Sequence, residues 1–127
     1  MLNSVVLMGR MTKDPELRRT ESGIAVASFS LACERDYASQ NGERETDFID
    51  VVCWRNSAEF VDKYFEKGMM TVVIGRLQIR GWTGKDGNER RSAEILADHV
   101  YFGEGKKDKD KTQGFAEVTE DDPDLPF

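Results

Sequence analysis

An alternation of apolar residues in the first third of the chain limits the possible folds more than any other feature. In residues 24–34, IAVASFSLACE, every second residue from Ala25 to Cys33 falls on one face and is apolar. This alternation predicts a strand with one face in a core. Four further segments rich in β-branched and aromatic residues are predicted as strands. They are residues 3–11, 46–54, 70–80 and 92–102, the last interrupted near Ala97-Asp98.

One segment has helical spacing instead. In residues 56–68, NSAEFVDKYFEKG, apolar side chains recur from Ala58 to Phe65 on a single helical face. Asn56, with Glu59 three residues later, resembles a capping box. The segment therefore predicts one helix of about three turns.

The order of these segments predicts the fold class. Three strands, a helix and two strands, joined by turns at Asn41-Gly42 and Asp86-Gly87, predict a mainly all-β, five-stranded OB-fold barrel. The helix would lie between strands 3 and 4. Closing the barrel hides the strand edges, which suits a chain of this size. A β-grasp or SH3-like barrel is possible, but the position of the helix fits either one less well.

The charge is unevenly distributed. Residues 1–103 carry 14 Lys and Arg against 16 Asp and Glu, whereas residues 104–127 carry 4 against 8. The second segment lacks the apolar content needed to fold, so we expect a disordered acidic C-terminal tail. The expected organisation is a folded domain (1–103), a flexible linker (104–119) and an acidic tip (120–127). The near-neutral domain is compatible with a polyanionic ligand despite the net charge of −6.

Residues that could support catalysis or hold a metal are sparse. His99 is the single histidine and lies in a strand pattern, and no nucleophile, phosphate-loop or zinc motif occurs. Cys33 and Cys53 are twenty residues apart with no CxxC pair, which favours reduced, buried thiols. We therefore expect a non-enzyme with no catalytic residue, metal or cofactor. No apolar run is long enough to span a membrane and no signal peptide is evident, so we expect a cytoplasmic protein.

Aromatic residues interleaved with arginine suggest a nucleic-acid surface. Tyr37, Phe48, Trp54 and Trp82 lie in or beside predicted strands and close to basic residues. Unpaired bases stack on such rings with roughly 1–3 kcal/mol each, and arginine adds phosphate contacts. Small barrels also bury aromatic residues, as we expect for Phe29, Phe60 and Phe65. For Phe48, Trp54 and Trp82 the pattern fits core packing about as well, although Trp82 lies in a Gly-flanked polar hairpin where burial is difficult.

The body of the chain resembles the bacterial single-stranded DNA-binding protein family, including its phage-encoded members. The resemblance covers residue 1 to about 103 and is carried by LNSVVLMGRMTKDPELRRTESGIAVASFSLACER, TDFIDVVCWRNSAEF, YFEKG and GRLQIRGWTGKDG. It implies a homo-oligomer, usually a tetramer, that wraps single-stranded DNA and pairs its subunits through the first strand. The apolar edge of SVVLMG makes such pairing physically sensible.

The resemblance also implies which residues meet DNA. The stacking positions fall on Tyr37, Phe48, Trp54 and Trp82, with Phe48 standing where many members have tryptophan. The positions expected to bind phosphate are Arg10, Lys13, Arg18, Arg35, Arg55, Lys67, Arg76 and Arg80. Arg19, Lys85, Arg90 and Arg91 are candidates that fit solvated loop charges as well.

The terminal DLPF resembles the acidic tip with which this family docks replication, repair and recombination proteins. The residues concerned are Asp121, Asp122, Asp124, Leu125, Pro126 and Phe127. The Phe127 ring suits an apolar pocket and its carboxylate a basic rim, while the aspartates would steer toward positive surfaces. Pro123 interrupts the acidic run, and the short linker limits the reach of the tip. The alternative is a solubilising tail, but such a tail would not be expected to finish in Leu-Pro-Phe.

These expectations together favour one function. The chain would bind single-stranded DNA without marked sequence specificity, protect it in the nucleoid and recruit partner proteins through its tip. Two alternatives remain on the same fold: an accessory protein-interaction module for replication restart or recombination, and an RNA-binding OB domain.

Overall fold

The computed structural model describes residues 1–104, and the tip residues predicted to dock partners lie outside this range. Six strands and one helix occur within the described residues. They are β1 (Val5–Met11), β2 (Glu16–Arg19), β3 (Ala25–Ala38), β4 (Arg44–Trp54), α1 (Asn56–Tyr64), β5 (Met70–Thr83) and β6 (Glu89–Phe102).

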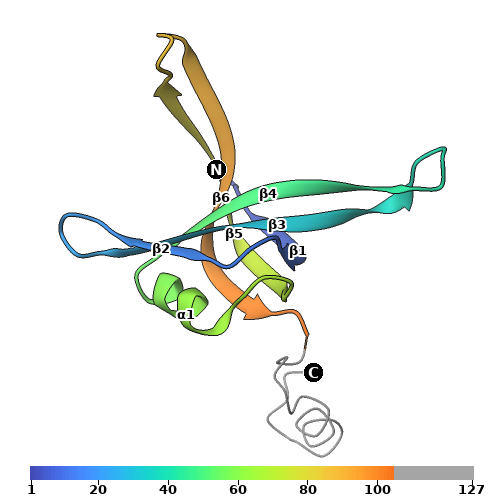
Figure 1. Cartoon of the computed structure of the whole chain (residues 1–127), viewed down its shortest axis with the longest axis horizontal. Helices are drawn as coiled ribbons and strands as arrows, with labels where there is room; N and C mark the ends of the chain where they lie inside the picture. Colours follow the sequence, from blue (N-terminus) through green and yellow to red (C-terminus); the bar gives the residue numbers. More distant parts are fainter. Residues whose placement is uncertain (105–127) are drawn as a thin grey trace, which may run out of the picture.

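Five of the strands close into a barrel. Neighbouring strands follow the order β1-β5-β6-β4-β3, and pairing of β1 with β3 completes the circle (Figure 1). β4 and β6 run parallel and the other pairs are antiparallel. The short β2 pairs with β3 outside the barrel. This closed all-β arrangement, with its helix between the third and fourth barrel strands, confirms the predicted OB-fold.

The core follows the alternation read from the sequence. The side chains of Ala25, Ala27, Phe29 and Leu31 on β3 are buried, while Cys33 at the barrel rim is half-buried. They pack against Val51 and Cys53 of β4, Val73 of β5 and Ile95 of β6 in one cluster. Because strand side chains alternate, every second residue of these strands faces outward.

α1 packs on the barrel through the predicted face, with Ala58 and Val61 buried. The Phe65 ring, just past the helix, is buried and stacks on Phe102 of β6, with 4.6 Å between ring centroids. Phe60 is half-buried against the same cluster.

The predicted capping box is wrong. The N-cap residue is Arg55, and its side chain makes no capping hydrogen bond. Glu59 instead accepts a hydrogen bond from Arg19 at 3.3 Å, so its carboxylate is directed toward β2 rather than back to the helix start. An ion pair formed in the folded chain thus replaces the local contact.

Three hairpins, β2–β3, β3–β4 and β5–β6, extend from the barrel in different directions (Figure 1). The β3–β4 arm (residues 34–48) and the β5–β6 arm (residues 78–93) contain no buried residue. Both arms are longer than the sequence predicts, and β2 lies in a segment for which no strand was predicted. The predicted interruption near Ala97-Asp98 is present as a β-bulge, because Gly75 pairs with Ala97 but Ile74 pairs with His99.

Candidate nucleic-acid interface

The four aromatic residues singled out by the sequence lie on the outside of the barrel and its arms. Their exposed fractions are 66% for Tyr37, 70% for Phe48, 42% for Trp54 and 46% for Trp82. On β4, Phe48 and Trp54 alternate with the inward-facing Val51 and Cys53, which explains their outward direction. Burial of these rings in the core is thereby excluded.

Strand register places an arginine in the same cross-strand row as each aromatic residue of β4. Arg18 pairs with Val26, and Val26 pairs with Trp54, so the three form a row across β2, β3 and β4. A second row on the same outer face joins Arg10 of β1, Ala32 of β3 and Phe48 of β4. In each row a small or branched apolar residue separates a cation from a ring. The rows are six residues apart, or about 20 Å along the strands.

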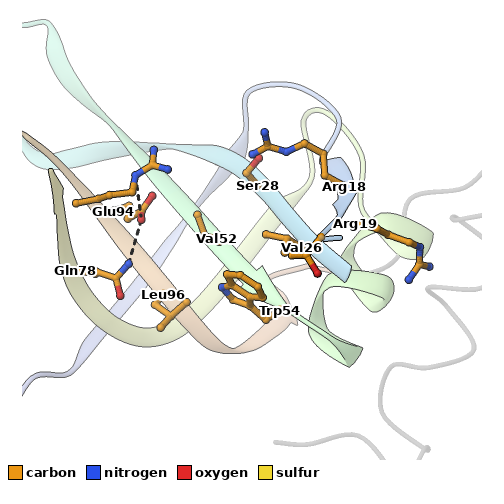
Figure 2. Close-up of a pocket in the computed structure, with 11 residues that line it drawn as sticks. Arg18, Arg19, Val26, Ser28, Val52, Trp54, Gln78, Glu94 and Leu96 are labelled. Atoms are coloured by element: carbon orange, nitrogen blue, oxygen red, sulfur yellow. Dashed lines mark hydrogen bonds and ion pairs between the residues drawn. The ribbon is translucent and has the colours of Figure 1, made fainter. Parts of the chain in front are cut away.

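The first row forms one wall of a groove of about 390 Å³ (Figure 2). Trp54 and Leu96 lie near each other in the groove, with Val26 beside them. Arg18 and Arg19 come from β2, and Arg80 comes from the opposite side on β5. The groove thus combines an exposed ring, apolar walls and three cations.

A nearly buried carboxylate also lines this groove. Glu94 of β6 accepts a hydrogen bond from the amide of Gln78 at 3.3 Å and lies 3.8 Å from Arg80 Nε (Figure 2). The guanidinium of Arg80 is in turn 5.8 Å from the centre of the Trp82 ring. Glu94 therefore links the groove to the aromatic residue of the β5–β6 arm through Arg80.

Arg35 differs from the other basic candidates because two carboxylates hold it, whereas Arg10 and Arg80 each pair with one, Glu104 and Glu94. Its guanidinium donates two hydrogen bonds to Asp47, at 3.1 and 3.0 Å, and one to Glu45 at 2.6 Å. The bonds to Asp47 are the main cause that holds the pKa of Arg35 above its ordinary value. The same bonds lower the pKa of Asp47.

The remaining basic candidates are exposed but spread over the surface. Arg55 lies between β4 and α1 with a left-handed backbone φ of 60°. Lys13 and Lys67 lie on facing loops, where the backbone N–H of Lys67 donates to the side chain of Asp14. Arg76 pairs with the groove residue Leu96. None of these four lines the groove.

The structure adds residues that the sequence reasoning left out or left uncertain. Arg19 lines the groove, and Arg44 and Arg10 both line a second hollow between β1 and the β3–β4 arm. These residues come together only when the strands pair, so no local sequence pattern predicts that they line the same hollows. On the β5–β6 arm, the side chain of Arg90 forms an ion pair with Asp86 at 2.9 Å, as expected of a solvated loop charge. Arg90 is also the cross-strand neighbour of Trp82.

Other chemistry has little support in the described part of the chain. No group of three or more His, Cys, Asp or Glu suited to a metal ion occurs within residues 1–104. Cys33 and Cys53 are free thiols, and burial raises the pKa of Cys53 to about 12. None of the described helices is long and apolar enough to cross a membrane.

Comparison with known proteins identifies the family. The sequence profile described as the Single-strand binding protein family matches residues 2–103. The chain belongs to this family. Members with curated names include a single-stranded DNA-binding protein of Bacillus cereus, 52% identical over 102 residues. Single-stranded DNA-binding protein 1 of Staphylococcus aureus strain Mu50 is 46% identical over 113 residues, and single-stranded DNA-binding protein 2 of Listeria monocytogenes is 50% identical over 106.

These relatives cover the chain well but extend beyond the matched part. The aligned regions include 80% of this chain and 60% of the Bacillus protein, and 89% and 72% for the Staphylococcus protein. For the Listeria protein the shares are 84% and 66%. The chain therefore spans about three fifths of the length of the Bacillus relative.

Proposed function

We propose that this chain binds single-stranded DNA without marked sequence specificity and that it is not an enzyme. The single observation that carries the proposal is the pair of rows Arg18–Val26–Trp54 and Arg10–Ala32–Phe48 on one outer face of the barrel. The flat face of any base can stack on an exposed ring, and the guanidinium in the same row can donate hydrogen bonds to phosphate. Family membership and the printed names of the relatives support the same ligand.

In this proposal each aromatic residue stacks an unpaired base while basic residues follow the backbone. Trp54 and Phe48 would act on the barrel, Tyr37 on the β3–β4 arm and Trp82 on the β5–β6 arm. Arg10, Arg18, Arg19 and Arg80 would meet phosphates, and Lys13, Arg55, Lys67 and Arg76 would extend the path. Binding of this kind would protect single strands in the nucleoid, because an occupied strand cannot pair or be cut.

Fluorescence titration with oligo(dT) at two salt concentrations tests the proposal. Stacking on Trp54 and Trp82 should quench tryptophan emission, and affinity should fall as salt rises because bound phosphates release counterions. RNA of equal length serves as the comparison ligand. Absence of quenching with oligo(dT), or a preference for RNA, would contradict the proposed ligand.

We also propose that the chain forms a homo-oligomer, with a tetramer as the expected size. Within residues 1–104 no strand pairs with Val5–Met8 on the side away from β5, so this edge can receive a second copy. Val6 and Met8 are exposed on the outer face of the same strand. Native mass spectrometry gives the number of copies directly.

From the resemblance in sequence, we further propose that the tip from Asp121 to Phe127 docks replication, repair and recombination proteins. Deleting Leu125 to Phe127 should abolish capture of such partners and leave DNA affinity nearly unchanged. A pull-down with the intact and shortened chains, with an internal acidic substitution such as Glu117→Gln as the control, measures this. Equal capture by both chains would rule out docking through the tip.

A further inference from the structure

The β3–β4 arm lacks the interactions that usually fix a hairpin. All its residues from 34 to 48 are exposed or half-buried, so it has no core of its own. Its backbone ladder is also irregular, because the pair Glu34–Thr46 is followed only by Ala38–Arg44. Two strands without a packed face are marginally stable in water, so side-chain contacts must help to hold them together.

Arg35 bridges the irregular part of the ladder. From β3 it reaches two carboxylates of β4, with a bidentate contact to Asp47 and a third bond of 2.6 Å to Glu45. We call Arg35, Glu45 and Asp47 the arm clamp. An exposed ion pair usually contributes little, but bidentate geometry and a third charge are the conditions under which it keeps a fixed arrangement.

The clamp lies between two of the proposed stacking residues. Tyr37 is two residues beyond Arg35 on β3, and Phe48 directly follows Asp47 on β4. Strand side chains alternate, so Asp47 and its partner Arg35 lie on the face opposite Phe48. Arg35 is therefore directed away from the row that contains Arg10 and Phe48.

We propose that Arg35 is a positioning residue: the arm clamp holds β3 and β4 in the arrangement that presents Tyr37 and Phe48 to bases, and Arg35 does not itself bind phosphate. The inference rests on the proposed binding of single-stranded DNA. Fixing the two rings before binding removes part of the ordering cost when DNA arrives.

The Asp47→Asn variant distinguishes a positioning role from a simple charge effect, because the two predict opposite changes in affinity for DNA. Asp47→Asn removes a negative charge from a protein that binds a polyanion, so charge alone predicts tighter binding. Loss of the clamp predicts weaker binding, by about 3- to 10-fold. Asp36→Asn is the matched control, since Asp36 is on the same arm and its side chain forms no hydrogen bond or ion pair with any residue from 1 to 104.

Oligo(dT) titrations of wild type, Asp47→Asn, Asp36→Asn and Arg35→Gln over a range of salt concentrations complete the test. We expect weaker binding by Asp47→Asn and Arg35→Gln with an unchanged salt slope, and unchanged or slightly tighter binding by Asp36→Asn. If Arg35→Gln lowers the salt slope by about one, Arg35 binds phosphate directly and the inference is wrong. Failure of the wild type to bind at all would instead contradict the proposed function.

Limited trypsin digestion gives a readout that does not depend on DNA. Asp47→Asn retains every trypsin site, and an opened arm should be cut after Arg44 several-fold faster than in wild type or Asp36→Asn. Equal cleavage rates, with equal melting temperatures, would show that the clamp does not hold the arm.

Discussion

At the scale of single residues, the sharpest constraint is the close approach of β5 to β6 at Gly75. Beside the β-bulge at Asp98, an added Cβ on Gly75 would overlap the carbonyl oxygen of Leu96. It would also lie 2.9 Å from the Cα of Ala97. Both atoms belong to the backbone, so no side-chain rotation relieves the clash. Glycine is required by space at this position.

Gly75→Ala should therefore destabilise the domain by at least about 2 kcal/mol, as overpacking against a fixed backbone does. Gly81→Ala is the matched control on the same strand, because its nearest atom would be 3.6 Å away. Urea unfolding of both variants measures the difference. A free energy of unfolding for Gly75→Ala within about 0.5 kcal/mol of that for Gly81→Ala would contradict the clash.

Cys53 is the residue from which a dependence of stability on pH is expected. Its thiol is buried on β4, and burial raises its pKa to about 12 from an unfolded value of about 8.5. Between these values the unfolded chain loses a proton that the folded chain keeps. The folded state is therefore favoured fully below about pH 8.5 and loses this contribution as the pH rises toward 12.

The free energy of unfolding should fall with pH between about 9 and 11, by up to about 1.4 kcal/mol per pH unit from this one thiol. Cys53→Ala should show a shallower fall, whatever its absolute stability. Guanidinium unfolding at several pH values, with reductant present, compares the two slopes. Identical slopes would mean that the Cys53 thiol ionises in the folded protein as freely as in the unfolded chain.

At the scale of strands and helices, burial decided what could be predicted. The five barrel strands and α1 were predicted because each buries alternate or helically spaced residues such as Phe29, Val51 and Val61. β2 was missed because its sequence, ELRR, has one apolar residue and is held by backbone pairing to β3. The arms were underestimated for the same reason, since their outer parts pair without burying anything.

The candidate site, too, was only partly predictable from the sequence. Exposure of Trp54 and Phe48 follows from their place in the β4 alternation, but the sequence alone did not distinguish exposed from buried rings. The pairing of Arg18 with Val26, and the meeting of Arg80 with Glu94, join segments far apart in the chain. Such contacts depend on barrel closure and strand register, which local spacing does not encode.

The groove assignment makes a prediction about β4. Trp54→Ala should weaken binding of oligo(dT) by about tenfold, since one stacked base contributes roughly 1–3 kcal/mol, and should leave the melting temperature nearly unchanged. Tyr64→Ala is the control, because Tyr64 on α1 has the same exposed fraction of 42% but lies outside the groove. Fluorescence anisotropy of labelled DNA compares the two variants. Equal affinities for both would remove Trp54 from the site.

At the scale of the whole molecule, the proposed binding and assembly surfaces lie on different parts of the barrel. The groove is built from β2, β3, β4, β5 and β6, and the edge left open for a second copy belongs to β1. Val6 and Met8 face outward beside that edge and line no part of the groove, although Met8 lines the second hollow together with Arg10. Assembly and base stacking should therefore be separable by mutation, although Arg10 near the end of β1 links the two surfaces.

The double change Val6→Lys and Met8→Lys should break pairing of copies through the β1 edge and so lower the mass of the assembly toward that of the single chain, 14.4 kDa. Symmetric pairing would bring like charges from two copies together, which opposes association, whereas the outward positions leave the core intact. Native mass spectrometry and circular dichroism report the assembly and the fold. Ile79→Lys, an equally apolar exposed position on the β5–β6 arm, controls for an added surface lysine.

Each dispersed chain should still quench its tryptophan fluorescence with short oligo(dT), because its groove is complete within one copy. A double variant that keeps the wild-type mass would show that the copies associate elsewhere, and loss of quenching in dispersed, folded chains would show that a single copy does not hold the binding site.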